Sequence, residues 1–222
     1  MGAGYDIITF DCYGTLIDWE SGIVNAFRSE AAADGVELDA ESIIAAYMDA
    51  EPAVEAEQYR PYKEVLRETA QRVAGELGWK IGSERAGFLA ASVPKWQPFP
   101  DTNLALERLA RKFQLAILSN IDDDLLEATL KHLTVRFALT ITAEQVRSYK
   151  PGLAHFREAT ARTPGLRLLH AAQSYFHDVV PTNRLKIPVA WINRKGESIV
   201  GAGVEPTYQL EDLTGLADLL HE

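Results

Sequence analysis

The chain has 222 residues, of which 47% are hydrophobic and 24% are charged, and its formal net charge at pH 7 is −10. This composition is ordinary for a folded protein with a real core, and the length allows one large domain or a domain with a sizeable insertion. The acidic balance argues against nucleic acid and against an anionic membrane as partners, because both require a basic surface.

Cysteine content and hydropathy indicate in which cellular compartment the protein is expected. Cys12 is the only cysteine, so no internal disulfide can form, which suits a reducing cytosol. No apolar run reaches the roughly 18 residues that a transmembrane helix needs, and the N-terminus lacks a basic region followed by a signal-type apolar stretch. We therefore expect a cytoplasmic protein without a membrane anchor.

The first predicted strand ends at a carboxylate. Residues 7–10 form a short apolar run that is typical of a buried strand. Asp11 follows directly, and Gly14 marks a tight turn beyond it. A carboxylate beside the free N–H groups of such a turn can act as a nucleophile towards an anionic substrate, or it can simply cap the next segment.

A helical block follows and contains no strand pattern. The predicted helices cover residues 18–33, 40–50, 61–77 and 84–91. Asp39 and Ser83 are the expected N-caps of the second and fourth helices, and Pro52 is expected to kink or end the second. A proline-rich hinge at residues 96–101 closes the block.

Short apolar strands then alternate with helices. The predicted strands cover 114–118, 139–142, 174–176 and 189–192, and the predicted helices cover 102–112, 123–133, 153–161, 180–185 and 210–220. This alternation is typical of a parallel sheet with helices on both faces. We predict an α/β fold, a doubly wound parallel sheet built from residues 1–17 and 97–222, with an all-helical cap domain of residues 18–96 inserted after the first strand.

Polar side chains stand at or just beyond the ends of consecutive predicted strands. They are Asp11, Ser119, Asn120, Lys150 and Asp178. Taken singly, Ser119, Asn120 and Asp178 could be helix caps, and Lys150 could be a solvated surface residue. Because ligands bind at the carboxyl edge of open α/β sheets, the group together predicts one site.

The chain resembles the haloacid dehalogenase (HAD) superfamily and, within it, the type II 2-haloacid dehalogenase branch. The resemblance rests on four ordered motifs, FDCYGT at 10–15, LSN at 118–120, YKP at 149–151 and PVAWINR at 188–194. Phosphatases of the superfamily usually carry a second aspartate two residues after the nucleophile. Here that position is Tyr13, which resembles the dehalogenases. Their substrates release a halide, and a halide needs no proton to leave. The resemblance implies a HAD-like Rossmannoid core with a cap.

The resemblance also implies a reaction, the hydrolytic dehalogenation of a small 2-haloalkanoic acid, with no metal or organic cofactor. Asp11 attacks the halogen-bearing carbon, and water hydrolyses the resulting ester. Lys150 neutralises the crowded anions and keeps Asp11 ionised. Thr15 orients Asp11, and Asp178 positions Lys150 or the hydrolytic water.

The implied substrate is a small anion, and its contacts come from the same loops. Ser119 and the backbone N–H groups of the first turn, at Cys12 and Tyr13, hold the substrate carboxylate. Asn120 helps to bind the leaving halide. A homodimer formed through the cap is also allowed by the resemblance, although no residue demands it.

Some positions depart from the dehalogenase pattern. A cap arginine usually cradles the halide, and an ungapped alignment places Met48 there, with Arg60 as the nearest cationic substitute or as a snorkelling surface residue. A Ser and an Asn usually precede the last aspartate of the site, here Asp178, by five and three residues, where this chain has Gln173 and Tyr175. His177 is either an added base or a packed histidine at a strand end, and packing is favoured.

Two other functions stay open. One is a phosphatase for a small phosphometabolite, with Mg²⁺ held by Asp11 and Asp178, although Tyr13 replaces the usual acid. The other is a non-catalytic binding protein on a retained scaffold, against which the retained polar residues argue. Asp11→Asn would separate an enzyme from a binder.

The cap face is expected to set specificity, because its closure over a small substrate excludes water. The candidate lining residues are Tyr47, Met48, Tyr59, Arg60, Tyr62 and Trp96. Taken singly, each of them is better explained as an ordinary core or interdomain contact.

Overall fold

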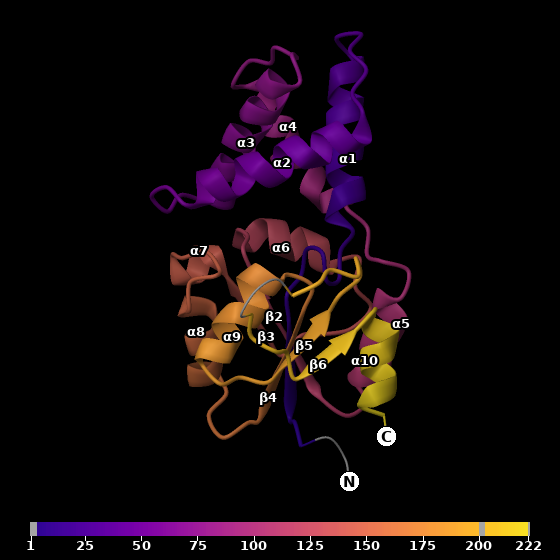
Figure 1. The fold of residues 1–222 in the computed structure, drawn as a ribbon, viewed down its shortest axis with the longest axis vertical. Helices are drawn as coiled ribbons and strands as arrows, with labels where there is room; N and C mark the ends of the chain where they lie inside the picture. Colours follow the sequence, from indigo (N-terminus) through magenta and orange to yellow (C-terminus); the bar gives the residue numbers. More distant parts are fainter. Residues whose placement is uncertain (1–3, 200–202, 222) are drawn as a thin grey trace.

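The computed structural model describes residues 4–199 and 203–221. Six parallel strands form its central sheet, in the order β3-β2-β1-β4-β5-β6 (Figure 1). The strands are β1 (Ile7–Phe10), β2 (Gln114–Ser119), β3 (Leu139–Thr142), β4 (Leu168–Ala172), β5 (Val189–Ile192) and β6 (Tyr208–Leu210). Helices cover both faces of this sheet, which confirms the predicted doubly wound α/β class.

The helices fall into two groups. Those around the sheet are α5 (Thr102–Leu109), α6 (Asp123–Leu130), α7 (Ala143–Val146), α8 (Ala154–Arg162), α9 (Val180–Arg184) and α10 (Leu213–Leu219), with a π-helical turn η3 (Tyr175–Val179). Those of the cap are α1 (Trp19–Ala32), α2 (Ala40–Glu55), α3 (Tyr62–Glu76), η1 (Arg85–Gly87), α4 (Phe88–Ser92) and η2 (Val93–Lys95). Figure 1 shows the cap helices as a separate layer above one edge of the sheet. In the described part of the chain no helix is long and apolar enough to cross a membrane.

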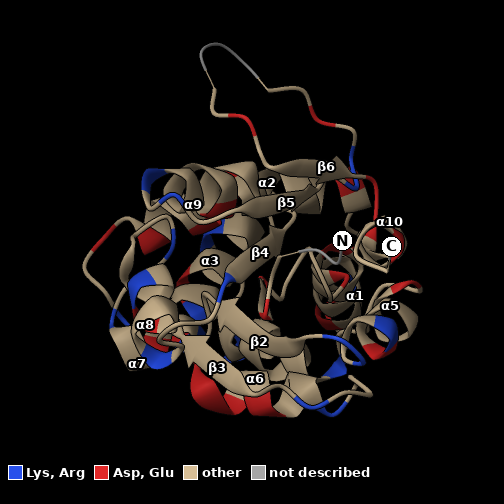
Figure 2. Cartoon of the chain, turned by 90° about the horizontal axis from the view of Figure 1, so that it is seen from below, with Lys and Arg blue, Asp and Glu red and all other residues tan. Residues whose placement is uncertain are grey.

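The central strand β1 positions the first catalytic candidate. All four residues of β1 are buried, and Ile7 lies opposite Gln114 of β2 on one side and Leu168 of β4 on the other. The later strands extend the sheet in opposite directions from β1, so its carboxyl end is a topological switch point, where open α/β sheets bind ligands. Asp11 follows β1 directly and therefore lies at this point. The strands carry no charged residue, and acidic and basic residues lie on the surrounding helices and loops (Figure 2).

The predicted strand at 174–176 is wrong. β4 occupies Leu168–Ala172 instead, and residues 175–179 form the turn η3. A buried histidine, His170, interrupts the apolar run of β4 and hides the strand in the sequence. The N–H of His177 donates to the Ser174 hydroxyl at 3.1 Å, so Ser174 starts a helical turn where we predicted a strand.

Other element boundaries also differ from the prediction. The edge strand β6 was not predicted, and the last helix starts at Leu213 because Asp212 caps it, accepting the N–H of Gly215 at 2.8 Å. The second helix does not end at Pro52 but continues to Glu55, and the buried face of that helix extends with it to Val54. The fourth predicted helix is broken into the short pieces η1, α4 and η2.

The two connections between cap and core lie side by side. The N–H of Asp18 donates to the carbonyl of Gln97 at 2.9 Å, and Ile17 forms an antiparallel bridge with Pro98. The predicted hinge falls on these residues. The domain limits of 17/18 and 96/97 stay a prediction, as does independent motion of the cap.

Candidate active site

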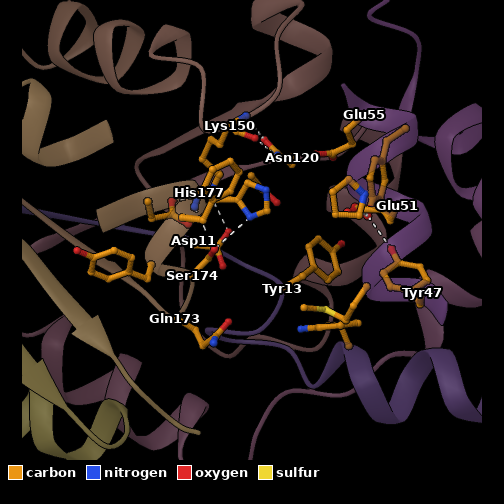
Figure 3. Close-up of a pocket in the computed structure, with 18 of the residues that line it drawn as sticks. Asp11, Tyr13, Tyr47, Glu51, Glu55, Asn120, Lys150, Gln173, Ser174 and His177 are labelled. Atoms are coloured by element: carbon orange, nitrogen blue, oxygen red, sulfur yellow. Dashed lines mark hydrogen bonds and ion pairs between the residues drawn. The ribbon is translucent and has the colours of Figure 1, made fainter. Parts of the chain in front are cut away.

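A cavity of about 430 Å³ lies between the cap helix α2 and the carboxyl ends of the strands (Figure 3). Asp11, Ser119 and Lys150 contribute to its core wall, and Tyr47 and Met48 contribute to its cap wall. Cavities of this size hold ligands in many proteins. The cavity therefore defines the candidate site, and it brings together residues that are far apart in the sequence.

Lys150 lies between two carboxylates. Its Nζ atom donates to Asp11 Oδ1 at 2.8 Å, to Asp178 Oδ1 at 2.8 Å and to the carbonyl of Leu118 at 3.0 Å. Burial alone lowers the pKa of a lysine, but here the two carboxylates outweigh burial and raise the pKa of Lys150. Lys150 is therefore a permanent ammonium that neutralises part of the negative charge at the site.

The nucleophile candidate Asp11 is held at both oxygens. The Thr15 hydroxyl donates to Asp11 Oδ2 at 2.8 Å, and the same hydroxyl accepts the backbone N–H of Gln173 at 2.8 Å. Because the Gln173 N–H fills the acceptor side of the Thr15 oxygen, the hydroxyl proton points to Asp11. Thr15 thus has the geometry of an orienting residue for Asp11.

The Ser119 and Asn120 side chains have different surroundings. The Ser119 Oγ atom is buried in the cavity wall and has no hydrogen-bond partner among the described residues. The Asn120 amide binds the backbone of Lys150 in both directions, donating from Nδ2 to its carbonyl at 3.0 Å and accepting its N–H at 2.7 Å. Ser119 is thus free to bind a ligand. The Asn120 amide positions Lys150 and also lines the cavity, so its contact with a halide stays a prediction.

The Cys12 side chain is buried outside the cavity wall, whereas the Tyr13 ring lines the cavity (Figure 3). The Cys12 side chain is fully buried, and burial raises the pKa of its thiol well above the usual range. The Tyr13 hydroxyl lies 2.7 Å from the Thr129 hydroxyl, and the Tyr13 ring packs edge-on against Trp96. Burial also raises the pKa of Tyr13 well above its usual range. The backbone N–H groups of Cys12 and Tyr13 stay the predicted contacts for a substrate anion, and the Tyr13 side chain contributes to the cavity wall.

Asp178 reaches the site from the turn η3, not from the end of a strand. It is fully buried, and burial would raise its pKa, but Lys150 and a hydrogen bond from His170 outweigh burial and lower the pKa below the usual range. Its Oδ2 atom is buried and has no partner in the described part of the protein.

The neighbouring His177 lines the cavity, and its Nδ1 lies 3.1 Å from the Ser174 hydroxyl. Burial lowers the pKa of His177, which keeps the ring neutral at pH 7.

His170 belongs to the site but was missed by the sequence analysis. Its Nε2 atom lies 2.9 Å from Asp178 Oδ1, and its Nδ1 lies 2.8 Å from the Thr9 hydroxyl. The residue is fully buried inside β4. The pattern could have suggested it, because a histidine inside an apolar strand must be hydrogen bonded.

The cap wall is only partly as predicted. Tyr47, Met48, Tyr62 and Trp96 line the cavity, whereas Tyr59 and Arg60 do not. The Arg60 guanidinium pairs with Glu57, so the structure does not bring this predicted substrate contact to the cavity. Met48, which the alignment placed at the usual arginine position, is 51% exposed. The sequence analysis overlooked two glutamates of this wall, Glu51 and Glu55.

The core wall offers few protein ligands to a Mg²⁺ ion. Asp11 and Asp178 are the two carboxylates of the core wall, and the Lys150 ammonium already lies between their Oδ1 atoms. Within residues 4–199 and 203–221, no group of three or more His, Cys, Asp or Glu side chains is arranged to hold a metal ion. A Mg²⁺ ion held by these two carboxylates would take its remaining oxygen ligands from water or from a substrate. Whether the reaction proceeds without a metal stays a prediction.

Comparison with known proteins identifies the class. The family model of haloacid dehalogenase-like hydrolases matches residues 5–167. That span includes Asp11, Thr15, Ser119 and Lys150 and covers most of the chain. The chain therefore belongs to the haloacid dehalogenase-like hydrolases, and it is a hydrolase of the HAD superfamily.

Individual relatives are similar over the whole length. The chain is 28% identical to the (S)-2-haloacid dehalogenase H-109 of Pseudomonas putida over 96% of each chain. The fold matches L-2-haloacid dehalogenase from Xanthobacter autotrophicus with chloropropionic acid covalently bound, at a TM-score of 0.81, 20% identity and 98% coverage of both chains. It also matches YfnB from Bacillus subtilis, solved bound to magnesium, at a TM-score of 0.84, 18% identity, and coverage of 99% of this chain and 100% of that one.

Proposed function

We propose that this protein hydrolyses the carbon–halogen bond of a 2-halogenated carboxylic acid through an ester on Asp11. The observation that carries the proposal is Tyr13, which supplies no acid where a phosphatase would need one. The Lys150 ammonium between Asp11 and Asp178 supports the role of Asp11 as the nucleophile. A halide leaves as an anion, so the site needs no proton donor for the leaving group. The similarity to the Pseudomonas putida dehalogenase supports the same reaction class.

In the first step the Asp11 carboxylate forms a C–O bond with C2 of the substrate. The carbon–halogen bond breaks at the same time, and the halide leaves with the bonding electron pair. Lys150 and Thr15 fix the carboxylate, which lowers the entropic cost of attack. Ser119 Oγ and the N–H groups of Cys12 and Tyr13 hold the substrate carboxylate in this proposal, because hydrogen-bond donors orient an anion best when they are fixed in place.

In the second step water adds to the carbonyl carbon of the Asp11 ester. The bond between that carbon and the ester oxygen then breaks, and this oxygen takes one proton of the water and leaves on the 2-hydroxy acid. The second proton of the water passes to solvent, which restores the Asp11 carboxylate. The water needs a proton acceptor, and the Asp178 Oδ2 atom is a carboxylate oxygen without a partner in the described chain. Its lowered pKa keeps Asp178 ionised and able to accept a hydrogen bond from water, while making it a weak base.

The test measures halide and phosphate release by the purified protein, each with EDTA and with Mg²⁺. Chloroacetate, bromoacetate, fluoroacetate and 2-chloropropionate serve in one arm, and an aryl phosphate with a panel of small phosphometabolites in the other. Halide release that persists in EDTA and disappears in Asp11→Asn is expected. Phosphate release that depends on Mg²⁺, without halide release, would replace this proposal by the phosphatase alternative.

A further inference from the structure

Two acidic side chains project from the cap into the cavity. Glu51 and Glu55 lie four residues apart on α2, so they share one face of the helix. Figure 3 shows them across the cavity from Asp11 and His177. A cap that faced only a small anion would be expected to carry a cation at this face, and the pair of glutamates does the opposite.

These glutamates are not neutralised by the protein. The Tyr62 hydroxyl donates to Glu51 Oε1 at 3.0 Å, and the Glu55 Oε1 atom is buried with no partner among the described residues. Burial raises the pKa of Glu51 to about 7 and that of Glu55 well above its usual range. A buried carboxylate without a counter-ion takes up a proton rather than stay charged, so a cation would be needed to hold this pair ionised.

The neighbouring cations are already paired. In the described structure Lys150 is bound to Asp11 and Asp178, and the other lysine of the cavity wall, Lys195, pairs with Glu20. Arg60 and Arg72 both pair with Glu57, outside the cavity. A counter-ion for Glu51 and Glu55 would therefore come from the ligand.

The walls around the two glutamates also suit a cation. The aromatic rings of Tyr47, Trp19 and Tyr62 line the cavity beside them, with Trp19 and Tyr47 centroids 5.5 Å apart. Aromatic faces attract ammonium groups, most strongly where water is excluded. At about 430 Å³ the cavity also exceeds what a two- or three-carbon haloacid requires.

We propose that Glu51 and Glu55 bind a positively charged ammonium group at the far end of the substrate. The substrate would then be a zwitterion. Its scissile carbon would lie at Asp11, its carboxylate at Ser119 and its ammonium group at the cap. This inference rests on the proposed function for the reacting end of the substrate. The charge preference of the cap wall can be tested without turnover.

The kinetic test compares three 2-bromo acids of matched length that differ only in the terminal group. They are 2-bromo-6-aminohexanoate, 2-bromoheptanoate and 2-bromoheptanedioate, ending in ammonium, methyl and carboxylate. We expect kcat/KM for halide release to favour the ammonium compound by roughly tenfold or more, as is usual for a charge-assisted contact. The preference should vanish in the double variant Glu51→Gln/Glu55→Gln.

Asp49→Asn is the matched control, because Asp49 is an exposed carboxylate on the same helix and does not line the cavity. It should keep the preference for the ammonium compound. An equal or greater kcat/KM for the methyl or carboxylate compound would overturn the inference. A preference that survives in the double variant would overturn it as well.

A binding arm separates this inference from the proposed reaction. Calorimetry with 6-aminohexanoate and heptanoate, which carry no halogen, measures the ammonium preference without chemistry. Tighter binding of 6-aminohexanoate to the wild type, lost in the double variant, supports the subsite even if no haloacid is turned over. Equal binding of the two acids, together with halide release from bromoacetate, would reject the subsite and retain the dehalogenase.

Discussion

The Nε2 atom of His170 lies 2.9 Å from Asp178 Oδ1, inside the sheet and out of contact with solvent. The opposite ring nitrogen, Nδ1, lies 2.8 Å from the Thr9 hydroxyl of β1. A buried chain of hydrogen bonds therefore runs from β1 through His170 to Asp178 and on to Lys150. His170 touches neither the cavity nor Asp11, so we assign it a positioning role.

Replacing His170 should impair chemistry more than binding. In His170→Leu, Asp178 loses one of its two hydrogen bonds, each worth about 1.5–3 kcal/mol when a charged group takes part. We expect kcat to fall roughly ten- to hundredfold with KM changed little. His170→Asn, which can still donate, should recover part of kcat. Thermal unfolding of both variants identifies a purely structural effect, which would lower stability and leave kcat of the folded enzyme intact.

Lys150 should be essential for stability as well as for activity. In Lys150→Met the carboxylates of Asp11 and Asp178 lose their shared counter-ion, and breaking a buried ion pair costs about 3–5 kcal/mol. Lys150 holds the pKa of Asp178 down, so this stabilisation of the wild type is fully present above the ordinary aspartate pKa. It is lost progressively as the pH falls from there through the lowered pKa of Asp178 in the folded protein. Urea unfolding of both proteins at pH 7 and at pH 3 should therefore show a smaller difference at pH 3. An equal difference at the two pH values would contradict this.

The sequence was sufficient for the parts of the site that follow apolar strands. Asp11 and Ser119 come directly after or at the end of such runs, and parallel strands bring their carboxyl ends to one edge. Asp178 was selected because it follows the predicted strand at 174–176, although that strand is wrong: the break at His170 hid β4, and Asp178 lies in the turn beyond it. The remaining site depends on tertiary packing: nothing in the spacing of Glu51 and Glu55 shows that α2 continues past Pro52 and turns this face to the cavity.

The pKa of Glu51 makes a pH-dependent prediction for stability. Burial raises this pKa to about 7, whereas an exposed glutamate has a pKa of about 4.3. Between these values the folded protein binds more protons than the unfolded chain, so the contribution of Glu51 to stability falls as the pH rises from about 4.3 to 7. A glutamine at position 51 cannot ionise, so the Glu51→Gln variant does not lose stability as the pH rises. This variant should be about 1–3 kcal/mol more stable than the wild type at pH 8.

The same comparison at pH 4.5 should show little difference, because Glu51 is then protonated in the folded protein. Asp49→Asn on the exposed side of α2 serves as the control and should follow the wild type at both pH values. Guanidinium unfolding curves measure all three proteins. A Glu51→Gln variant that is less stable than the wild type at pH 8 would mean that the carboxylate is ionised and paired in the folded protein.

Asp122 holds the cap against the core. Its carboxylate accepts the N–H of Tyr62 at 2.7 Å and the N–H of Lys63 at 2.9 Å, so a core residue caps the first turn of α3. Asp122→Ala should cost about 1 kcal/mol, the usual effect of losing an N-cap. It should also raise KM, because Tyr62 lines the cavity and its helix is no longer fixed. Asp122→Asn keeps one acceptor oxygen, so its stability and its KM should lie between those of the wild type and of Asp122→Ala. An unchanged KM in Asp122→Ala would show that the contact serves stability alone.

Gly22 and Gly75 provide a matched test of how the hinge side of the cap is packed. A Cβ atom on Gly22 in α1 would lie 2.4 Å from the ring of Trp96, whereas a Cβ on Gly75 in α3 meets nothing within 4 Å. Both glycines lie inside helices, where alanine is favoured by about 0.5–1 kcal/mol. We expect Gly75→Ala to stabilise the protein by that amount. Gly22→Ala should instead destabilise it by about 1–3 kcal/mol, because Trp96 is 4% exposed and overpacking such a contact displaces the ring.

Trp96 also lines the cavity, so Gly22→Ala should lower kcat/KM while Gly75→Ala leaves it unchanged. Thermal unfolding and halide release measured on the same two samples test both effects, and stabilisation by Gly22→Ala would mean that the contact between α1 and Trp96 is looser than the structure describes.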